Sequence, residues 1–311
     1  MTSPAPDAVL VFRLDDARRR ARGCAVAEAL SLVGALGARV EPNGPFGTQG
    51  GLFHLAVPAA ALDAVVARLP RLGYTAAVER VVFVEGGSRP PTETARWKGR
   101  LYVLERICEV DREQLRARAP DRREFIIPDG AGGVRRVTGY RGDSSPAGRR
   151  GLPVSDARLL VNLAYRPAHW RLLDPFGGAG GVVVEALASG ATVFSSDIDP
   201  FVMYGLHDLT HRHVVADVRR LPLADRSIAA IASEPPYDAG ATAAVCDGLR
   251  EMDRVLGSDG PIALMVAGEQ AAPVRAAAAG LPWTIELDEG VDRKGLAVHV
   301  FKWRKTGRSQ R

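Results

Sequence analysis

Apolar and polar residues follow a regular pattern over the first 85 positions. Short apolar runs, which predict strands, alternate with longer stretches in which apolar residues recur at the spacing of a helix. Their β-α-β-β-α-β order is that of a ferredoxin-like fold, so we expect an α+β, ferredoxin-like N-terminal domain over residues 1–85. The predicted elements are strands at 8–14, 37–42, 51–57 and 78–85, with helices at 16–36 and 58–73.

The pattern is less regular between residues 86 and 150. Residues 86–100 are rich in Gly, Pro and polar side chains, which is typical of a linker. Strands are predicted at 101–110 and 124–128, with a short helix at 111–119 between them. We interpret residues 86–150 as a connecting segment or as a reduced substrate-binding module.

From residue 151 onward, strands and helices again alternate. This alternation predicts a parallel, doubly wound sheet, so the expected fold class of residues 151–311 is α/β and Rossmann-like. The last two strands have no helix between them, which predicts an antiparallel hairpin at one edge of the sheet. Predicted strands include 171–176, 191–199, 228–234, 261–267, 283–289 and 296–305, and the predicted helices are 152–164, 180–190, 241–257 and 269–280. Ser155 is expected to cap the first of these helices, and Gly190 to end the second.

Composition and charge narrow the functional class. The hydrophobic fraction of 46% and the charged fraction of 25% are those of a globular protein. No secretory leader or membrane span is predicted, and three widely spaced cysteines predict neither a disulfide framework nor a metal site, so a cytoplasmic location is expected. Formal charge sums to +1 over residues 1–85, +6 over 86–150 and −2 over 151–311. This concentration of positive charge favours a polyanionic partner, although it can also be an ordinary solvated surface.

A glycine-rich turn follows the first strand of the predicted parallel sheet, in LLDPFGGAGG (residues 172–181). A strand that runs through glycines into a helix is the place where α/β sheets bind ligands, because glycine lets ligand atoms approach the backbone. The dinucleotide fingerprint is incomplete, since Val183 stands where its third glycine belongs, and no phosphate loop is present. A nucleoside ligand without a pyrophosphate therefore suits this turn best.

Carboxylates stand at the ends of the next two strands. Asp197, about twenty residues after the turn, is placed to accept hydrogen bonds from ribose hydroxyls. Asp199, two residues later, is the second choice for that role. In VVADVRRLPL (residues 214–223), a third strand is predicted between 191–199 and 228–234, and Asp217 at its end can accept a hydrogen bond from an adenine amino group. Together with the turn, these aspartates form a consistent nucleoside-binding set.

A second cluster, ASEPPYD (residues 232–238), ends the fourth strand. Two consecutive prolines fix a rigid loop whose backbone carbonyls stay outside regular secondary structure. Tyr237 can stack on a planar target, and Glu234 places a carboxylate directly before the prolines. A plain strand-to-helix turn is the simpler interpretation of the same residues.

The order DPFGGAG, SSDIDP, VVADVRRLPL and SEPPYD resembles class I S-adenosylmethionine-dependent methyltransferases of the amino-methylating branch, whose signature is [D/N]-P-P-Y. More narrowly it resembles the tRNA guanosine N2-methyltransferases that carry a THUMP domain. The segments TGYRGD (residues 138–143) and LPVSDARLLVNLA (residues 152–164) are similar to the segment that joins the THUMP domain to the catalytic domain. The resemblance is specific over residues 138–240.

The resemblance implies S-adenosylmethionine as the cofactor and an exocyclic amine as the methyl acceptor. It implies that Asp197 and Ile198 hold the ribose part of the cofactor and Asp217 the adenine. The remaining implied roles are Asp174, Gly177, Gly178 and Gly180 around the methionine part, and Glu234, Pro235, Pro236 and Tyr237 around the amine.

Two departures from that pattern keep the substrate open. Residues 86–150 are short for a full THUMP domain, the part expected to bind the tRNA acceptor end. Glu234 replaces the usual Asp or Asn, which moves the carboxylate outward by one methylene. We therefore predict an N-methyltransferase for a guanine in tRNA, with a small-molecule amine or guanidine N-methyltransferase as the alternative. A nucleic-acid-binding module without catalysis is the third interpretation.

Overall fold

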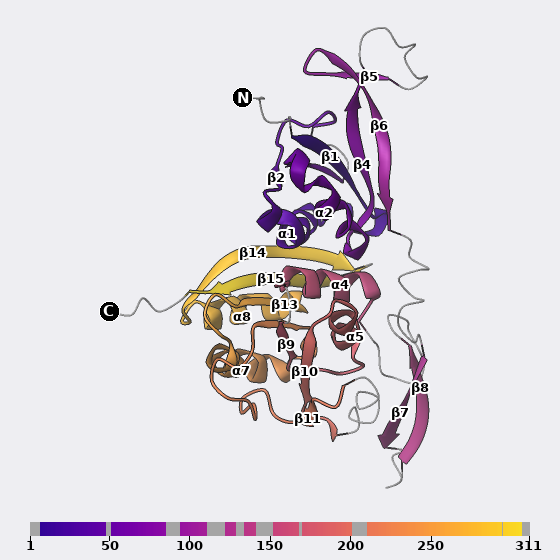
Figure 1. Cartoon of the computed structure of the whole chain (residues 1–311). Coiled ribbons are helices and arrows are strands. Elements are labelled where there is room, and N and C mark those ends of the chain that lie inside the picture. Colours follow the sequence, from indigo (N-terminus) through magenta and orange to yellow (C-terminus); the bar gives the residue numbers. More distant parts are fainter. Residues whose placement is uncertain are drawn as a thin grey trace, which may run out of the picture. The chain divides into compact units, whose positions relative to one another are not determined.

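The computed structural model of the chain forms two compact units, Met1–Asp111 and Arg112–Arg311 (Figure 1). The residues that it describes are 7–47, 51–84, 94–110, 122–128, 134–140, 152–167, 170–200, 210–293 and 295–306, with only the backbone described at 122–128 and 134–140. Within these residues, no helix is long and apolar enough to cross a membrane.

The N-terminal unit is built on a six-stranded sheet of order β2-β3-β1-β4-β6-β5, in which every neighbouring pair is antiparallel. Its first four strands have the order of a ferredoxin-like fold, which confirms the predicted fold class. The strands are β1 (Ala8–Leu14), β2 (Arg39–Val40), β3 (Leu52–Val57), β4 (Thr75–Phe83), β5 (Ala95–Trp97) and β6 (Arg100–Glu109).

The two helical stretches of this unit are more broken than the sequence predicts. In the first, the Asp15 side chain caps a single turn, and Ala21 then leaves the helical region before α1 begins. In the second, Pro70 falls inside the last turn, and a proline cannot donate the hydrogen bond that would continue a helix. The helices are η1 (Asp16–Arg18), α1 (Arg22–Val33), η2 (Gly34–Leu36), η3 (Ala59–Ala61), α2 (Leu62–Val66) and η4 (Leu69–Arg71).

The predicted boundary at residue 85 lies inside this sheet. Strand β6 pairs with β4 along its length, and its Tyr102 is buried in a cluster with Val9 and Val81. The segment predicted as a linker, residues 86–100, therefore contains β5, the edge strand of the same sheet, and does not join two domains. Beyond it, β7 (Arg122–Pro128) and β8 (Val134–Tyr140) form an antiparallel pair. The helix predicted at 111–119 lies outside the described residues.

The C-terminal unit contains a seven-stranded sheet of order β11-β10-β9-β12-β13-β15-β14. Only β15 runs antiparallel to its neighbours, because it forms a hairpin with the edge strand β14, as predicted. The parallel pairs leave the carboxyl ends of β9, β10, β11 and β12 at one edge of the sheet. The strands are β9 (Arg171–Asp174), β10 (Thr192–Asp197), β11 (His213–Val215), β12 (Ala230–Ser233), β13 (Pro261–Ala267), β14 (Trp283–Arg293) and β15 (Leu296–Lys305).

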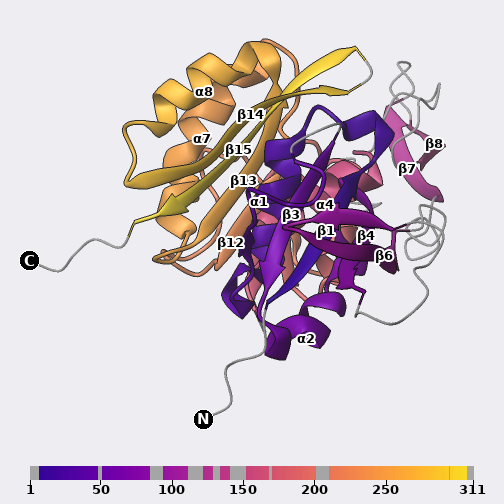
Figure 2. The same ribbon diagram turned by 90° about the horizontal axis from the view of Figure 1, so that it is seen from above.

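Helices cover both faces of this sheet. Figure 2 shows α7 and α8 together on one side of β13 and α4 on the other. Pro153, and not Ser155, is the N-cap residue of α4, and Ser155 lies within the first turn. Gly190 adopts a φ of 80° directly after the last helical residues of α5, as predicted for a residue that ends a helix. The helices are α4 (Val154–Leu163), α5 (Gly181–Ala188), α7 (Ala241–Val255), η6 (Gly268–Gln270) and α8 (Ala271–Ala278).

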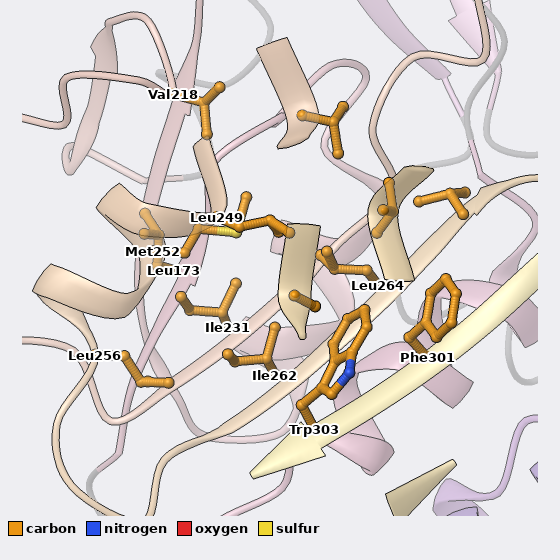
Figure 3. Packing of buried hydrophobic residues seen from close by; sticks show 14 of the residues in the cluster. Leu173, Val218, Ile231, Leu249, Met252, Leu256, Ile262, Leu264, Phe301 and Trp303 are labelled. Atoms are coloured by element: carbon orange, nitrogen blue, oxygen red, sulfur yellow. The ribbon is translucent and has the colours of Figure 1, made fainter. Parts of the chain in front are cut away.

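The main core lies between the sheet and α7 and α8 (Figure 3). Leu249 and Met252 of α7 are fully buried against Ile231 of β12 and Ile262 of β13. Phe301 of β15 continues the layer together with Trp303, and their rings stack with centroids 4.6 Å apart. Removing the apolar surface of these side chains from water stabilises the strands whose ends carry the candidate site.

Candidate active site

The glycine turn after β9 is held by backbone hydrogen bonds. Gly177 N donates to the carbonyl of Ser196 at 2.8 Å, and Gly180 N donates to that of Gly177 at 2.7 Å. Gly178 and Gly180 have φ values of 45° and 74°, a region that side chains disfavour. A Cβ built on Gly178 would meet only one atom within 4 Å, the Phe176 carbonyl oxygen at 3.8 Å, so this turn presents open backbone.

Asp174, the last residue of β9, is 1% exposed. Its Oδ1 accepts hydrogen bonds from Ser233 Oγ at 2.5 Å and from Phe176 N at 3.2 Å. Burial raises its pKa to about 7; these hydrogen bonds oppose the shift, and the charges of Asp197 and Glu234 add to it. Asp174 therefore titrates near neutral pH and joins the glycine turn to the end of β12.

Asp197 ends β10 and connects that strand to the same turn. Its Oδ2 accepts from Gly178 N at 2.8 Å and its Oδ1 from Asp199 N at 2.9 Å. Each oxygen keeps a further lone pair, as hydrogen bonding to ribose hydroxyls requires. Ile198 beside it is 67% exposed, so an apolar surface lies next to the carboxylate, where a nucleobase or sugar could cover it.

Asp217 lies just beyond β11, and Ala216 N donates to the carbonyl of Asp197 at 2.9 Å. The Asp217 carboxylate accepts from the Arg219 guanidinium, with contacts of 2.6 to 3.0 Å. These hydrogen bonds lower the pKa of Asp217. Its side chain is 30% exposed, so a ligand can reach it but would share it with Arg219.

The loop after β12 begins with Glu234, whose side chain is 20% exposed. Gln270, at the end of η6, donates to the carbonyl of Pro236 at 2.9 Å and accepts from Ala267 N at 3.0 Å, so it ties the loop to β13. Among the described residues, the carbonyl of Pro235 has no hydrogen-bond partner. The loop is therefore rigid and offers an available backbone acceptor.

Arg293, from the end of β14, reaches the same loop. Its Nη1 lies 2.7 Å from Glu234 Oε1 and 2.8 Å from the Tyr237 hydroxyl, and its Nε lies 3.0 Å from Asp156 Oδ2 on α4. Tyr237 Oη also donates to Glu234 Oε1. The sequence analysis did not single out Arg293 or Asp156 as site residues. Asp156 lies inside the LPVSDARLLVNLA segment, whose resemblance concerned only the connection between domains, and Arg293 lies in none of the quoted motifs.

The predicted site residues thus lie along one edge of the sheet, and their roles stay predictions. Asp174 and Asp197 form no ion pair with Lys or Arg among the described residues. A pyrophosphate would be repelled by these carboxylates, whereas ribose hydroxyls, a sulfonium and an ammonium would be attracted. The side chains present therefore fit the S-adenosylmethionine that the resemblance implies.

Comparisons with known proteins find curated relatives for about half of the chain. The chain is 30% identical over 152 residues to the tRNA (guanine(10)-N2)-dimethyltransferase of Methanothermobacter thermautotrophicus. This match covers 47% of the chain and 39% of that protein. It is 32% identical over 167 residues to the enzyme of the same name from Pyrococcus abyssi, covering 50% of this chain and 43% of that protein. The match thus spans less than half the length of each of these curated relatives. No protein-family profile matches the chain.

Among solved structures, TrmN from Thermus thermophilus aligns with a TM-score of 0.48 and 15% identity, over 96% of this chain and 99% of that one. The strand order thus shows a Rossmann-like, doubly wound sheet in the C-terminal unit, and the curated relatives that the chain resembles are named as methyltransferases.

Proposed function

We propose that this protein transfers a methyl group from S-adenosylmethionine to an exocyclic amine, and that its substrate is a guanine in tRNA. The observation that carries the proposal is the direct link between the two predicted half-sites. Ser233, the residue before Glu234, donates to Asp174 at the start of the glycine turn. The amine-accepting loop and the cofactor turn are therefore neighbours, as methyl transfer between two bound molecules requires.

The chain's own residues have distinct tasks in this proposal. Asp197 and Ile198 hold the nucleoside, while the glycine turn lets the backbone approach the methionine part. When bound, S-adenosylmethionine supplies an electrophilic methyl group on a sulfonium sulfur. Pro235 offers its carbonyl and Glu234 its carboxylate to the N–H groups of the acceptor amine, which orients the nitrogen lone pair.

The acceptor side must also manage a positive charge. An exocyclic amine of guanine is a weak nucleophile because its lone pair is delocalised, and the attacked nitrogen becomes cationic as the new N–C bond forms. The electron pair of the breaking S–C bond stays on sulfur, and the nitrogen loses a proton. A carboxylate beside the nitrogen stabilises the developing charge and can accept that proton.

Two features support RNA as the substrate. The curated relatives are named as tRNA guanine methyltransferases. The hairpin of β5 and β6 also carries exposed Arg96, Lys98 and Arg100, and its Trp97 ring stacks on Phe83 at 6.0 Å. Cations interleaved with an aromatic ring suit phosphates and bases. A glutamate, Glu41, lies 3.9 Å from Lys98, so the two arginines are the better probes.

Methyl transfer to bulk tRNA at increasing salt tests the proposal. Binding of RNA should weaken steeply between about 50 and 300 mM salt, because phosphate contacts release counterions. A small amine substrate would show almost no such dependence. If no tRNA is methylated and small amines or guanidines are, the substrate belongs to the alternative class of small molecules.

A charge-reversed hairpin sharpens the same experiment. Arg96→Glu with Arg100→Glu should raise the KM for tRNA and reduce the slope against salt by roughly one to two phosphate contacts. Arg19→Glu with Arg39→Glu is the matched control, because both residues are exposed in the same unit and the change in net charge is identical. Equal effects of the two pairs would show that the hairpin makes no specific contact with RNA.

A further inference from the structure

A cluster of four polar side chains lies at the base of the amine-accepting loop. Asp156 comes from α4, Glu234 and Tyr237 from the loop after β12, and Arg293 from the end of β14. Asp156 is completely buried, and only 13% of the Arg293 side chain is exposed. Arg293 lies between two carboxylates, with Nε 3.0 Å from Asp156 and Nη1 2.7 Å from Glu234.

The contacts of Glu234 are all made by one oxygen. Its Oε1 accepts from both Arg293 Nη1 and the Tyr237 hydroxyl, while Oε2 has no partner among the described residues. Arg293 Nη1 also donates to the Tyr237 oxygen at 2.8 Å. These contacts fix the rotamer of Glu234 and leave a single oxygen for a ligand.

Charge gives this arrangement a second consequence. Burial raises the pKa of Glu234, the charge of Asp156 adds to the effect, and Arg293 and the Tyr237 hydroxyl oppose it. The charge of Glu234 also acts on Asp174, because it raises the pKa of that residue together with the charge of Asp197. Arg293 is the cation in this group, and the neighbouring Asp156 and Glu234 raise its pKa against the effect of burial, so it remains charged.

We propose that Arg293 is a positioning residue for the acceptor half of the site: it holds the Glu234 carboxylate through Oε1, so that Oε2 receives the acceptor amine. This inference rests on the proposed function. It also explains the replacement of the usual Asp or Asn by Glu, because the longer side chain spans the distance to Arg293. Asp156 in turn anchors the guanidinium from the opposite side.

Arginine suits this place better than lysine. Its planar guanidinium presents Nε to one carboxylate and Nη1 to the other at the same time, whereas a lysine ammonium is a point charge on a flexible stem. Two carboxylates and one guanidinium leave one formal negative charge in the cluster. That charge favours an acceptor nitrogen that becomes cationic during transfer.

The test measures the ionisation of Glu234 with and without Arg293. An opposite charge at this range lowers the pKa of a carboxylate by about 1–3 units, so Arg293→Gln should raise the pKa of Glu234 by that amount. Side-chain ¹³C NMR of protein labelled at the glutamate carboxyl carbons follows this directly, with the Glu234→Gln spectrum assigning the signal. The acid limb of the pH profile of kcat should move to higher pH by the same amount. Arg293→Lys keeps a positive charge, so both changes should be smaller in that variant.

Arg304→Gln is the matched control. Arg304 also pairs with a glutamate, Glu286, but it lies at the opposite end of the β14–β15 hairpin, opposite Thr284. It should change neither the titration of Glu234 nor the kcat profile. A double variant completes the cycle: when Glu234 is already Gln, Arg293→Gln should cause no further loss of kcat.

An unmoved Glu234 titration in Arg293→Gln, or a further loss of at least about tenfold in the double variant, would overturn the proposal. If Arg293→Gln does not fold, Arg293→Lys takes its place in the titration. A lysine cannot hold both carboxylates, so the pKa of Glu234 should still rise, and an unchanged pKa would overturn the proposal. The NMR titration needs no substrate, so its failure is distinct from failure of the proposed function, which would appear as wild-type protein that methylates no amine.

Discussion

The two halves of the candidate site treat their carboxylates differently. Around the glycine turn, Asp174 and Asp197 accept only from backbone N–H groups and from the Ser233 hydroxyl among the described residues. Around the acceptor loop, Asp156 and Glu234 are bridged by the guanidinium of Arg293. The two carboxylates of the glycine turn therefore have no Lys or Arg beside them among the described residues, whereas the two at the acceptor loop share one guanidinium.

This difference follows from what each half is proposed to bind. S-adenosylmethionine has a sulfonium and an ammonium, so it supplies the positive charge that Asp174 and Asp197 lack. The acceptor amine arrives neutral and becomes cationic only during transfer, so its carboxylate must be kept ionised by the protein itself. The variants below test the two halves in turn.

The largest effect is expected at Glu234. Glu234→Gln keeps the length of the side chain but removes its charge, so cofactor affinity should stay unchanged while turnover falls by about 10²–10⁴-fold, the usual contribution of a positioned acid–base group. Calorimetry and single-turnover kinetics on the same protein measure the two quantities. If Glu234 merely orders the loop, turnover will be nearly normal and the melting temperature will fall instead.

Glu234→Asp sharpens the comparison further. Its carboxylate is one methylene shorter, so it cannot keep both the Arg293 and Tyr237 contacts. The sequence alone predicts a smaller loss for Asp than for Gln, because the negative charge is kept. A loss equal to that of Gln would show that the position of the carboxylate matters as much as its charge.

Asp174 should change stability as well as binding. In the folded protein it keeps its proton up to about pH 7, whereas in the unfolded chain it loses that proton near 3.8. The folded state therefore binds more protons between these values, so the free energy of unfolding falls as pH rises from about 4 to about 7. Asp174→Asn cannot titrate, and at about pH 8 it should be more stable than the cofactor-free wild type by at most roughly 4 kcal/mol, from about 1.36 kcal/mol per unit.

Denaturant unfolding at about pH 5 and pH 8 measures this difference. Asp199→Asn, on the same edge of the sheet, is the control and should show no comparable gain at the higher pH. Binding of the cationic cofactor should also favour ionised Asp174 and release a proton near neutral pH, which calorimetry in buffers of different ionisation enthalpy detects. Equal pH dependence in wild type and Asp174→Asn would contradict the assignment of the titration to Asp174.

Asp197 tests the cofactor half without a large change in stability. Asp197→Ala should weaken S-adenosylmethionine binding by about 1.5–3 kcal/mol, the range for hydrogen bonds to a charged group. Part of that loss comes through the turn, because Gly178 N loses its acceptor. Asp197→Asn separates the two effects, since its amide oxygen can still accept from Gly178. Unchanged affinity in Asp197→Ala would remove this residue from the site.

The sequence predicts the cofactor half better than the acceptor half for a physical reason. Asp174, the glycines and Asp197 lie at the ends of adjacent parallel strands, and such ends meet at one edge whatever the rest of the chain does. Arg293 lies 59 positions from Glu234 in sequence, and an ion pair over that distance has no local pattern. The THUMP-type resemblance, specific over residues 138–240, covers the loop itself but not Arg293, which holds Glu234.

The N-terminal unit shows the same limit. Its ferredoxin-like order could be predicted because each element has its own local period. The pairing of β6 with β4 could not, because Gly and Pro between two strands are equally typical of a domain linker and of a long connection within one sheet. The pairing with β4 and the burial of Tyr102 against Val9 and Val81 assign β6 to the first unit.

The smallest effect is expected at Asp217, the one cofactor-side carboxylate that already has a cation. Arg219 occupies both of its oxygens, at 3.0 and 2.6 Å. An adenine amino group would have to share these oxygens, so Asp217→Asn should cost only about 0.5–1.5 kcal/mol of cofactor affinity, the value of an ordinary hydrogen bond. Arg219→Gln removes the competitor and should leave affinity unchanged or slightly higher. If Asp217→Asn instead weakened binding as much as Asp197→Ala, the Arg219 contact would have to open when the cofactor binds, and the cofactor half would then contain no carboxylate paired with a cation at all.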